Sequence, residues 1–392
     1  MSTFPLQRPL LPSHYRVLLE PPDERGDETL VFMSEARRVK LKGRSFREFQ
    51  RALMPLLDGR HTLDEISAAT ADLFTPADIE EALQLLLTHG LVREAGPGNG
   101  ADGRTPQWNL FHDLGLDPVA THARLAGSTV AVFGLAGAGA VAAQALAAAG
   151  VGTLRLVESE AVAHSDPYLA SVYTGADIGR SRAEVLRDRL AANAGGARIE
   201  LAVAPLEDDA AVRNIVAGVD FVLCCLDGGR SSLIYKLNRV CVDLRQPWLA
   251  VATAGSEVLV GPLMQPPDTP CYLCFTMRLV AAAQNPEDEY ALKSLLDRRK
   301  RDDTASHESL APGEGVAGHL AALEVVKVLG GLPGLTLGGQ LQVVDLLTLG
   351  SQRHRLLRKP WCPVCDAARA GQGTDAAGAP APAAAVADSG AR

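Results

Sequence analysis

Several features that define common protein classes are missing from this sequence of 392 residues. No apolar run approaches the ~20 residues that a membrane-spanning helix needs. The beginning of the chain lacks a charged segment followed by an apolar one, so no secretory signal is predicted and we expect a cytoplasmic protein. The formal charge is −8 at pH 7. A negative balance of this size disfavours bulk binding to nucleic acid or to an anionic membrane.

The cysteines are odd in number and partly paired in spacing, which favours reduced thiols and a metal over disulfides. Cys271-x-x-Cys274 and Cys362-x-x-Cys365 are two knuckles, and the chain has no cysteine between them. Each knuckle places two thiolates on one side of a tight turn, so together they predict a closed tetrahedral zinc site with a structural role. Two unrelated buried pairs, or a redox CxxC, are the alternatives. The other cysteines, Cys224, Cys225 and Cys241, lie in apolar patterns and are predicted to be inert core residues.

Composition divides the chain into four parts. Residues 1–95 form one unit, and residues 96–105 are rich in glycine and polar residues, as linkers are. Residues 106–366 form a larger α/β domain. The tail, residues 367–392, has almost no large apolar side chain, cannot bury enough surface to fold and is predicted to be disordered.

The first unit reads as a small winged-helix-like α+β domain. Three short strands are expected at Tyr15–Leu19, Leu30–Met33 and Arg38–Leu41, followed by three helices at Phe46–Leu57, Leu63–Ala71 and Pro76–His89. Thr62 with Glu65 forms a capping box at the second helix, and Thr75 caps the third. A wing strand is predicted at Leu91–Glu94.

A cluster of basic residues begins at the third strand. The cations are Arg37, Arg38, Lys40, Lys42, Arg44, Arg47 and Arg51, with one acid, Glu48, among them. A local basic patch on an acidic protein indicates a local acidic partner, although a solvated face is the usual role of such a run.

A buried strand, Thr129–Phe133, leads into the glycine-rich loop Gly134-Leu-Ala-Gly137-Ala-Gly139 and an Ala-rich helix. Glycines at such a loop let a phosphate approach the helix N-terminus, where free N–H groups favour anions. Glu158, at the end of the next strand, Thr153–Val157, suits a ribose hydroxyl. The middle glycine of the common pattern is Ala136 here. A Rossmann-like core without a nucleotide therefore stays open.

Further motifs follow in order: Gly150-Val-Gly152, Asp177-Ile-Gly179, Cys225-Leu-Asp227, the two knuckles and the helix Gly315–Leu329. With them, residues 106–366 resemble the ThiF/MoeB adenylating family. The resemblance implies a doubly wound, mostly parallel α/β sheet with a structural zinc, usually in a homodimer. Active members use ATP and magnesium to adenylate the C-terminal carboxylate of a peptide or small protein.

The resemblance also shows what this chain has lost. Nucleotide contacts, if retained, fall on Gly134, Gly137, Gly139, Glu158, Arg182 and Asp227. Asp227 matches the metal-binding aspartate of active members, but Arg182 replaces their lysine. Leu169 replaces an arginine, Asp166 replaces an asparagine, and the segment Pro106–Phe111 offers no entry arginine. Because lost charge stabilisation costs orders of magnitude in rate, we expect a site that no longer adenylates and assign no catalytic residue.

Residues 56–66, preceded by Phe32-Met-Ser-Glu35, resemble PqqD-like peptide-recognition domains. Residues 5–95 are more closely similar to the leader-peptide-binding ThiF-like proteins of azole and thiopeptide gene clusters (TOMM clusters). In such modules the leader adds a strand to the sheet edge and packs against the third helix. The residues this implies for peptide contact are Arg37, Arg38, Val39, Lys40 and Leu41 on the strand and Ile79, Leu83 and Leu86 on the helix. The last three could equally be plain core.

The resemblance implies a scaffold in the synthesis of a ribosomally made peptide, such as a bacteriocin or thiopeptide. The scaffold would capture the leader of the precursor and deliver the core to a YcaO-type cyclodehydratase, which forms azolines with ATP. The rival hypothesis is an active adenylating enzyme that acts on a peptide carboxylate. Leu169 and the missing entry arginine count against it, whereas Asp227, Glu158 and Arg182 leave it open.

Overall fold

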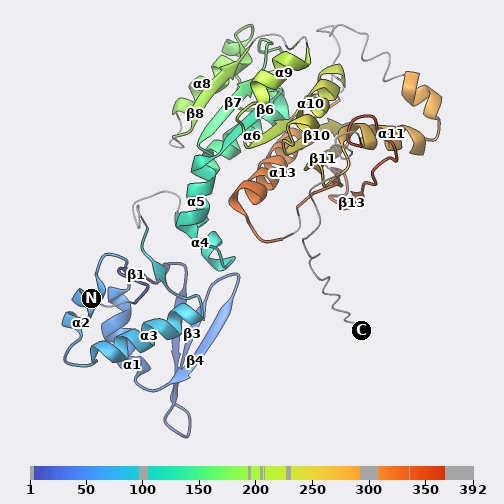
Figure 1. Ribbon diagram of the computed structural model, residues 1–392. Helices are drawn as coiled ribbons and strands as arrows, with labels where there is room; N and C mark the ends of the chain where they lie inside the picture. The colour runs from blue at the N-terminus through green and yellow to red at the C-terminus, as the bar shows by residue number, and fades with distance from the viewer. Residues whose placement is uncertain are drawn as a thin grey trace, which may run out of the picture. The chain divides into compact units, whose positions relative to one another are not determined.

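The computed structural model describes residues 4–96, 105–192, 196–203, 206, 208–226, 231–291, 308–334 and 336–366. The chain forms two compact units, shown in Figure 1. The first comprises residues 1–125 and 330–334, and the second comprises residues 126–329 and 335–392. Most of the predicted linker and all of the predicted disordered tail lie outside the described residues. None of the described helices is long and apolar enough to cross a membrane.

The first unit is built on an antiparallel sheet of three strands. In spatial order they are β2 (Arg16–Glu20), β3 (Glu28–Met33) and β4 (Arg38–Gly43). Two helices follow, α2 (Leu63–Ala69) and α3 (Pro76–Thr88), and β1 (Pro9–Leu10) pairs with β5 (Arg93–Glu94). Both helices begin with complete capping boxes, at Thr62 with Glu65 and at Thr75 with Asp78, which fixes their first turns.

The helix predicted at Phe46–Leu57 is present as three consecutive helical segments that differ in hydrogen bonding. They are α1 (Phe46–Glu48), a π-helical turn (Phe49–Leu53) and a 3₁₀ turn (Met54–Leu56). Pro55 explains why the segment does not end as a regular α-helix, because a proline has no N–H to donate and its ring clashes with the carbonyl four residues earlier. The predicted helical segment is therefore confirmed, though not as one regular α-helix, and its apolar residues Phe49 and Leu53 reach the core.

The boundary between the two compact units lies after Leu125. The sequence placed the start of the second domain at Pro106, whereas α4 (Thr105–Asp113) and most of α5 (Pro118–Gly127) belong to the first unit. Asp113 accounts for this, since it binds three groups of the first unit. The Tyr15 hydroxyl donates to it over 2.9 Å, the Ser34 hydroxyl over 2.8 Å, and His14 Nε2 lies 3.0 Å away.

The second unit is an α/β domain with a mixed sheet of eight strands. The spatial order is β13-β12-β11-β10-β9-β6-β7-β8. The strands are β6 (Thr129–Phe133), β7 (Thr153–Val157), β8 (Arg198–Ala202), β9 (Phe221–Cys224), β10 (Trp248–Ala254), β11 (Glu257–Met264), β12 (Gln340–Asp345) and β13 (Ser351–Arg355). Those from β10 to β8 run parallel, and β11, β12 and β13 are antiparallel. This is the doubly wound, ThiF/MoeB-like sheet that the sequence predicted.

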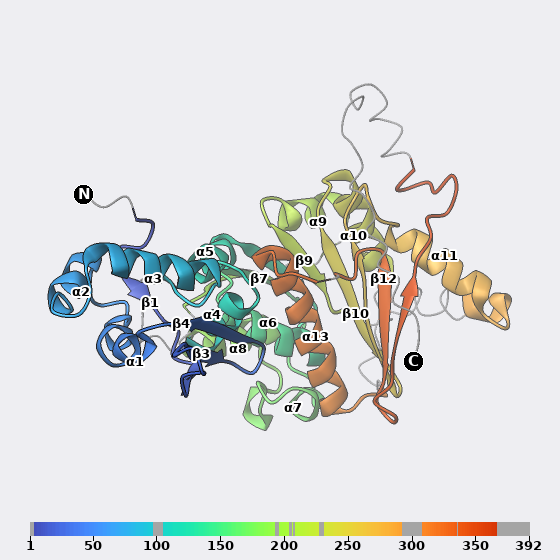
Figure 2. The same ribbon diagram turned by 90° about the horizontal axis from the view of Figure 1, so that it is seen from below.

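Helices cover both faces of this sheet. They are α6 (Gly137–Ala149), α7 (Asp166–Leu169), α8 (Arg182–Ala192), α9 (Asp209–Val216), α10 (Ser231–Asp243), α11 (Tyr272–Ala282) and α13 (Ala311–Gly330). Figures 1 and 2 show α6 and α13 side by side. Their approach is close, since a Cβ added to Gly318 would lie 2.6 Å from the carbonyl oxygen of Ala138.

The chain reverses its winding direction between β6 and β9. From β6 the sheet grows through β7 to β8, and the chain then returns to place β9 on the other side of β6. Ligands of open α/β sheets bind outside the carboxyl ends of the strands at such a point. The glycine-rich loop after β6 lies there, at the edge where such a fold binds its ligand.

Candidate functional site

The glycine-rich loop is shaped by close packing of the chain against itself. Gly134 and Gly137 have positive φ angles of 81° and 41°. A Cβ on Gly134 would lie 2.7 Å from the carbonyl oxygen of Cys225, and one on Gly139 would lie 1.9 Å from that of Gly134. These contacts alone require glycine at Gly134 and Gly139. Their presence is therefore explained by packing and does not by itself indicate a bound nucleotide.

Glu158 ends β7 as predicted, but its carboxylate is already engaged by the protein. It is buried and accepts hydrogen bonds from the backbone N–H groups of Leu135, Ser159 and Glu160, over 3.3, 3.0 and 3.1 Å. The hydroxyl of Tyr173 donates to the carbonyl of Leu135 over 2.7 Å. Both backbone polar groups of Leu135 are thus satisfied by side chains.

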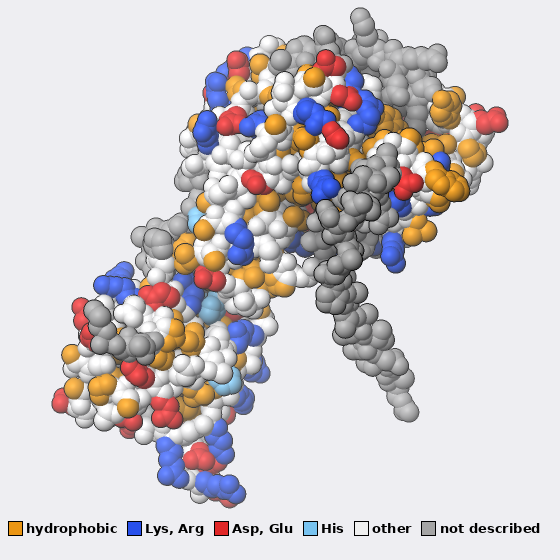
Figure 3. Space-filling model, viewed as in Figure 1, with side chains coloured by type: hydrophobic (Ala, Val, Ile, Leu, Met, Phe, Trp, Pro, Cys, Tyr) orange, Lys and Arg blue, Asp and Glu red, His pale blue; other side chains and the backbone are white. Residues whose placement is uncertain are grey.

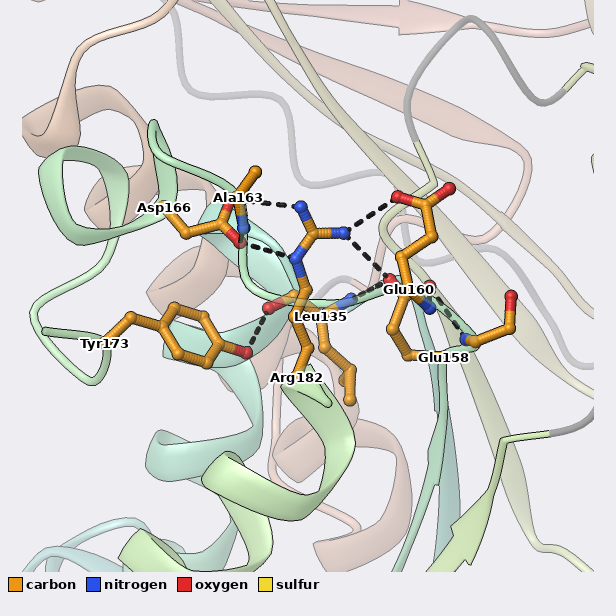
Figure 4. A network of polar contacts seen from close by, with 8 residues as sticks. Leu135, Glu158, Glu160, Ala163, Asp166, Tyr173 and Arg182 are labelled. Carbon is orange, nitrogen blue, oxygen red and sulfur yellow. Dashed lines mark hydrogen bonds and ion pairs between the residues drawn. The ribbon is translucent and has the colours of Figure 1, made fainter. Parts of the chain in front are cut away.

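Arg182, the first residue of α8, is buried among three carboxylates (Figure 4). Its Nε and Nη2 donate to the two oxygens of Asp166 over 2.5 and 3.1 Å. Its Nη1 donates to Glu160 over 3.0 Å and lies 3.6 Å from Glu158. Burial alone would lower the pKa of Arg182, but the hydrogen bonds and the negative charges around it outweigh burial and raise it. The guanidinium therefore stays charged and is held by its own protein.

This arrangement bears directly on adenylation. A cation that stabilises a developing phosphate charge must point its donors at that phosphate. Here one guanidinium is surrounded by the carboxylates of Glu158, Glu160 and Asp166, so the cluster is net negative. The donors of Arg182 are thus directed at carboxylates of the protein itself.

Two members of this cluster were not predicted from the sequence, Glu160 and Tyr173. Glu160 lies two residues after Glu158, and no motif separates it from an ordinary exposed acid. Tyr173 is 2% exposed, and burial raises its pKa. Leu169, at the position of the missing arginine, is partly buried in α7. Asp227 lies outside the described residues, so its predicted role as a metal-binding aspartate stays a prediction.

The four knuckle cysteines come together as predicted. The Sγ atoms of Cys271, Cys274, Cys362 and Cys365 all lie within 4.8 Å of one another, and all four residues are buried. Three Sγ–Sγ distances are 3.9 Å (Cys271 to Cys274), 3.7 Å (Cys271 to Cys362) and 3.5 Å (Cys274 to Cys365). A tetrahedral ion with metal–sulfur bonds of ~2.3 Å would set such distances at roughly 3.8 Å. The cluster can therefore hold a metal ion, and it leaves no open position for substrate.

Neighbouring groups fix the knuckles in place. The guanidinium of Arg358 donates to the carbonyls of Pro267 and Thr269, over 2.5 and 2.9 Å. The backbone N–H of Lys359 lies 3.4 Å from Cys274 Sγ. Such N–H···S contacts orient a thiolate ligand. Of the remaining cysteines, Cys224 and Cys241 lie in the core of the second unit, and burial raises the pKa of Cys225 and Cys241.

Three residues of the basic cluster, Arg38, Lys40 and Lys42, lie on β4, an edge strand of the three-stranded sheet. Its outward row contains Arg38, Lys40 and Lys42, whereas Val39 and Leu41 face the core. Figure 3 shows Lys and Arg side chains gathered, with acids among them, at the lower end of this unit. Lys40 pairs with Glu20 over 2.8 Å and Lys42 with Asp23 over 2.7 Å. The cluster is thus partly neutralised.

Two parts of the predicted peptide surface need correction. Ile79, Leu83 and Leu86 of α3 are 0%, 0% and 2% exposed, because they pack against the sheet in the core of the first unit. They are core residues and form no groove wall in this structure. Arg37 is tied to the end of α3, where its guanidinium donates to the carbonyls of His89 and Gly90 over 2.5 and 3.3 Å. In this structure its side chain therefore joins the turn before β4 to the C-terminal end of α3.

The sequence and the fold are both similar to those of known proteins. A sequence model of the ThiF family matches residues 104–364, well over half of the chain. The protein belongs to the ThiF family. It is 31% identical over 236 residues to the molybdopterin-synthase adenylyltransferase of Salmonella typhimurium, and this alignment covers 60% of this chain and 86% of that protein. It is 30% identical over 261 residues to the ThiS adenylyltransferase of Escherichia coli, covering 67% and 94%.

Solved structures extend the likeness to both units. The structure of E. coli MccB with ATP aligns with a TM-score of 0.65 at 17% identity and covers 91% of this chain and 99% of that chain. The microcin C7 biosynthetic enzyme MccB in complex with N-formylated MccA gives a TM-score of 0.66 at 17% identity, with the same coverage. At this identity the likeness is one of fold, and its coverage includes the first unit.

Proposed function

We propose that this ThiF-family protein recognises the leader of a ribosomally made precursor peptide and does not adenylate it. The observation that carries the proposal is the position of β4. Among the described residues no strand pairs with the outer edge of β4, so its backbone N–H and C=O groups on that side are open to a further strand. An extended peptide can bind such an edge through main-chain hydrogen bonds, with side chains giving selectivity.

The register of the sheet indicates which peptide side chains would suit the edge of β4. On the outer face, cross-strand rows join Arg16, Met33 and Arg38, then Leu18, Val31 and Lys40. A strand added beside β4 would continue these rows, with alternate side chains on opposite faces. Acidic residues at every second position would face Arg38 and Lys40. The residues between them would lie on the side of Val39, where apolar side chains are favoured.

Electrostatics favour an acidic peptide of moderate affinity. Arg38 is exposed and has no ion-pair partner among the described residues. Lys40 is paired with Glu20, but the two side chains are 56% and 38% exposed, so the pair contributes little and can exchange with a peptide carboxylate. Binding should therefore weaken as salt concentration rises.

The second unit supplies the other half of the proposal. Arg182, where the resemblance implies a lysine in active members, is held by Asp166 and Glu160, so its guanidinium is not free to bind a phosphate. The unit would then act as a rigid platform. Its four-cysteine cluster is proposed to hold a structural zinc, which ties the segment after β13 back to α11.

The partner is proposed from the resemblance of residues 5–95 to leader-binding proteins of azole and thiopeptide clusters. A YcaO-type cyclodehydratase would receive the bound precursor and convert Cys, Ser or Thr of its core to azolines with ATP. This protein would contribute recognition, as a homodimer, and the enzyme would contribute chemistry.

Fluorescence anisotropy with a labelled peptide of alternating Glu and Val tests the peptide site. The double variant Arg38→Glu with Lys40→Glu should weaken binding about tenfold or more, since it replaces attraction with repulsion at two positions. Arg25→Glu, an exposed arginine in the loop after β2, is the matched control and should leave affinity unchanged. Equal affinity in all three proteins, or stronger binding of a Lys–Val peptide, would reject the β4 edge.

An active adenylating enzyme is the alternative function. It is favoured by the fold likeness to MccB, a structure solved with ATP, across both units. Exchange of labelled pyrophosphate into ATP in the presence of the peptide separates the two functions. A scaffold gives no exchange above background. Peptide-dependent exchange that disappears in Asp227→Asn would establish the enzyme.

A further inference from the structure

A carboxylate of the protein itself occupies the N-terminus of α6. Glu314, in the first turn of α13, is 8% exposed, and its Oε2 accepts the backbone N–H of Ala138 over 2.7 Å. A Cβ added to Gly137 would lie 2.3 Å from the same oxygen. Gly137 thus leaves space that Glu314 fills, where α13 lies beside α6 in Figures 1 and 2.

The carboxylate is held from two further directions. Thr253, on β10, donates its hydroxyl to Oε1 over 2.8 Å. Ser309, just before α13, donates its hydroxyl to the same oxygen over 2.5 Å. Both oxygens of Glu314 are therefore bound, by groups from α6, from β10 and from the segment just before α13. This is a fixed position, unlike that of an acid on an exposed helix.

The helix end that Glu314 meets is one that attracts anions. The 13-residue helix α6 has Ala136 at its N-cap, and no side chain of that residue caps it. Its first N–H groups and its dipole favour a negative group, which is why phosphates bind at glycine loops that open helices. Glu314 supplies that negative group from 176 positions further along the chain.

We infer that Glu314 is an internal anion that takes the place of a phosphoryl group and excludes phosphates from the glycine-rich loop. The inference deepens the proposed function, because it gives the silent adenylation site a second cause that is independent of Arg182. Arg182 is a cation already neutralised, whereas Glu314 both fills the anion position and repels a competing negative charge.

Calorimetric titration with Mg-ATP and with inorganic pyrophosphate tests this inference. Glu314→Ala opens the position and should bind pyrophosphate at least about tenfold more tightly than the unaltered protein, because a like charge within a few Å has gone. Glu308→Ala removes the same charge from an exposed neighbour and should change nothing. Equal pyrophosphate and Mg-ATP binding by Glu314→Ala and the unaltered protein would overturn the inference.

A second variant covers loss of folding, since Glu314→Ala leaves the Ala138 N–H without a partner. Glu314→Gln keeps an oxygen for that bond but removes the charge. Its affinity for pyrophosphate should therefore rise less than that of Glu314→Ala, and its melting temperature should not change. If Glu314→Ala does not fold, unchanged affinity in Glu314→Gln overturns the inference. Binding of the Glu–Val peptide should be the same in all these variants, so a failed peptide site and a failed anion site give different results.

Discussion

Arg182 and Asp166 form a two-point ion pair in the interior of the second unit, with Nε–Oδ2 and Nη2–Oδ1 distances of 2.5 and 3.1 Å. The sequence predicted a departure from active adenylating relatives at both positions. In the structure these two residues are in contact, and each satisfies the other. The charge of Arg182 therefore stabilises the fold.

Asp166→Asn should destabilise the second unit by about 3 kcal/mol, because breaking a buried ion pair from one side leaves a buried charge with fewer partners. Urea unfolding followed by circular dichroism measures the loss. Asp188→Asn is the matched control, since the pairs of Asp188 with Arg180 and Arg187 are half-exposed and should contribute less than about 1 kcal/mol. Equal effects of the two substitutions would contradict the role of the Arg182–Asp166 pair.

The sequence was sufficient to predict the strands and the metal cluster, for local reasons. Thr129–Phe133 and Thr153–Val157 are strands with the predicted bounds, because a buried parallel strand is a short apolar run that ends at a turn. Each knuckle could be recognised because the CxxC spacing is a local signal, and the fold brings the two knuckles together. The surroundings of Arg182 had no such signal. Glu160 lies 22 positions away, and only the fold brings its carboxylate to the guanidinium.

The side on which a helix buries its residues was equally hard to predict. Ile79 and Leu83 repeat at helical spacing in α3, and that spacing fits either a core or a groove. Burial decides for the core, since both side chains are fully covered. Pro55 shows the opposite case, because its effect on the segment Phe46–Leu57 is local and was available in the sequence.

Leu83→Ala should therefore behave as a core truncation. We expect a loss of about 2–5 kcal/mol in the stability of the first unit, from lost apolar burial and the cavity that remains. Leu85→Ala, two residues along the same helix and 40% exposed, should cost less than about 1 kcal/mol. Thermal unfolding of both variants measures the difference. A stability loss in Leu83→Ala as small as that in Leu85→Ala would contradict the core position of Leu83 and favour a role in peptide contact.

Zinc binding is expected at one ion per chain, measured by elemental analysis of the purified protein. Cys362→Ser should release it and lower the melting temperature, because the ion joins two segments far apart in the sequence. Cys241→Ser changes a buried cysteine outside the cluster and should keep the ion. Full metal content in Cys362→Ser, or unaltered melting after chelation, would refute a structural four-cysteine site.

The stability of the first unit should depend on pH through His112. Burial, helped by the charge of Arg93, lowers the pKa of His112 to about 4 from 6.5. Between pH 6.5 and about 4, His112 therefore binds a proton in the unfolded chain but not in the folded one. Stability is thus complete above pH 6.5 and falls as the pH drops towards 4, by at most ~3 kcal/mol. Urea unfolding between pH 7.5 and 4.5 measures the slope.

His112→Gln should flatten that slope, whereas His319→Gln, at an exposed histidine of α13, should not. Asp113 acts in the same direction at lower pH. Burial raises its pKa, but hydrogen bonds from His14, Ser34 and Tyr15 outweigh burial and lower it, so its contribution is lost as the pH falls below 3.8. An unchanged slope in His112→Gln would contradict this account.

The central claim is that peptide recognition has been kept while the adenylation site has been closed. Calorimetric titration of the unaltered protein with the acidic Glu–Val peptide, in the absence and presence of Mg-ATP, tests it most directly. We predict that the peptide binds equally well in both conditions and that Mg-ATP alone produces no binding heat. Binding of Mg-ATP in the micromolar range, where active sites commonly work, would contradict the claim and establish a working nucleotide site.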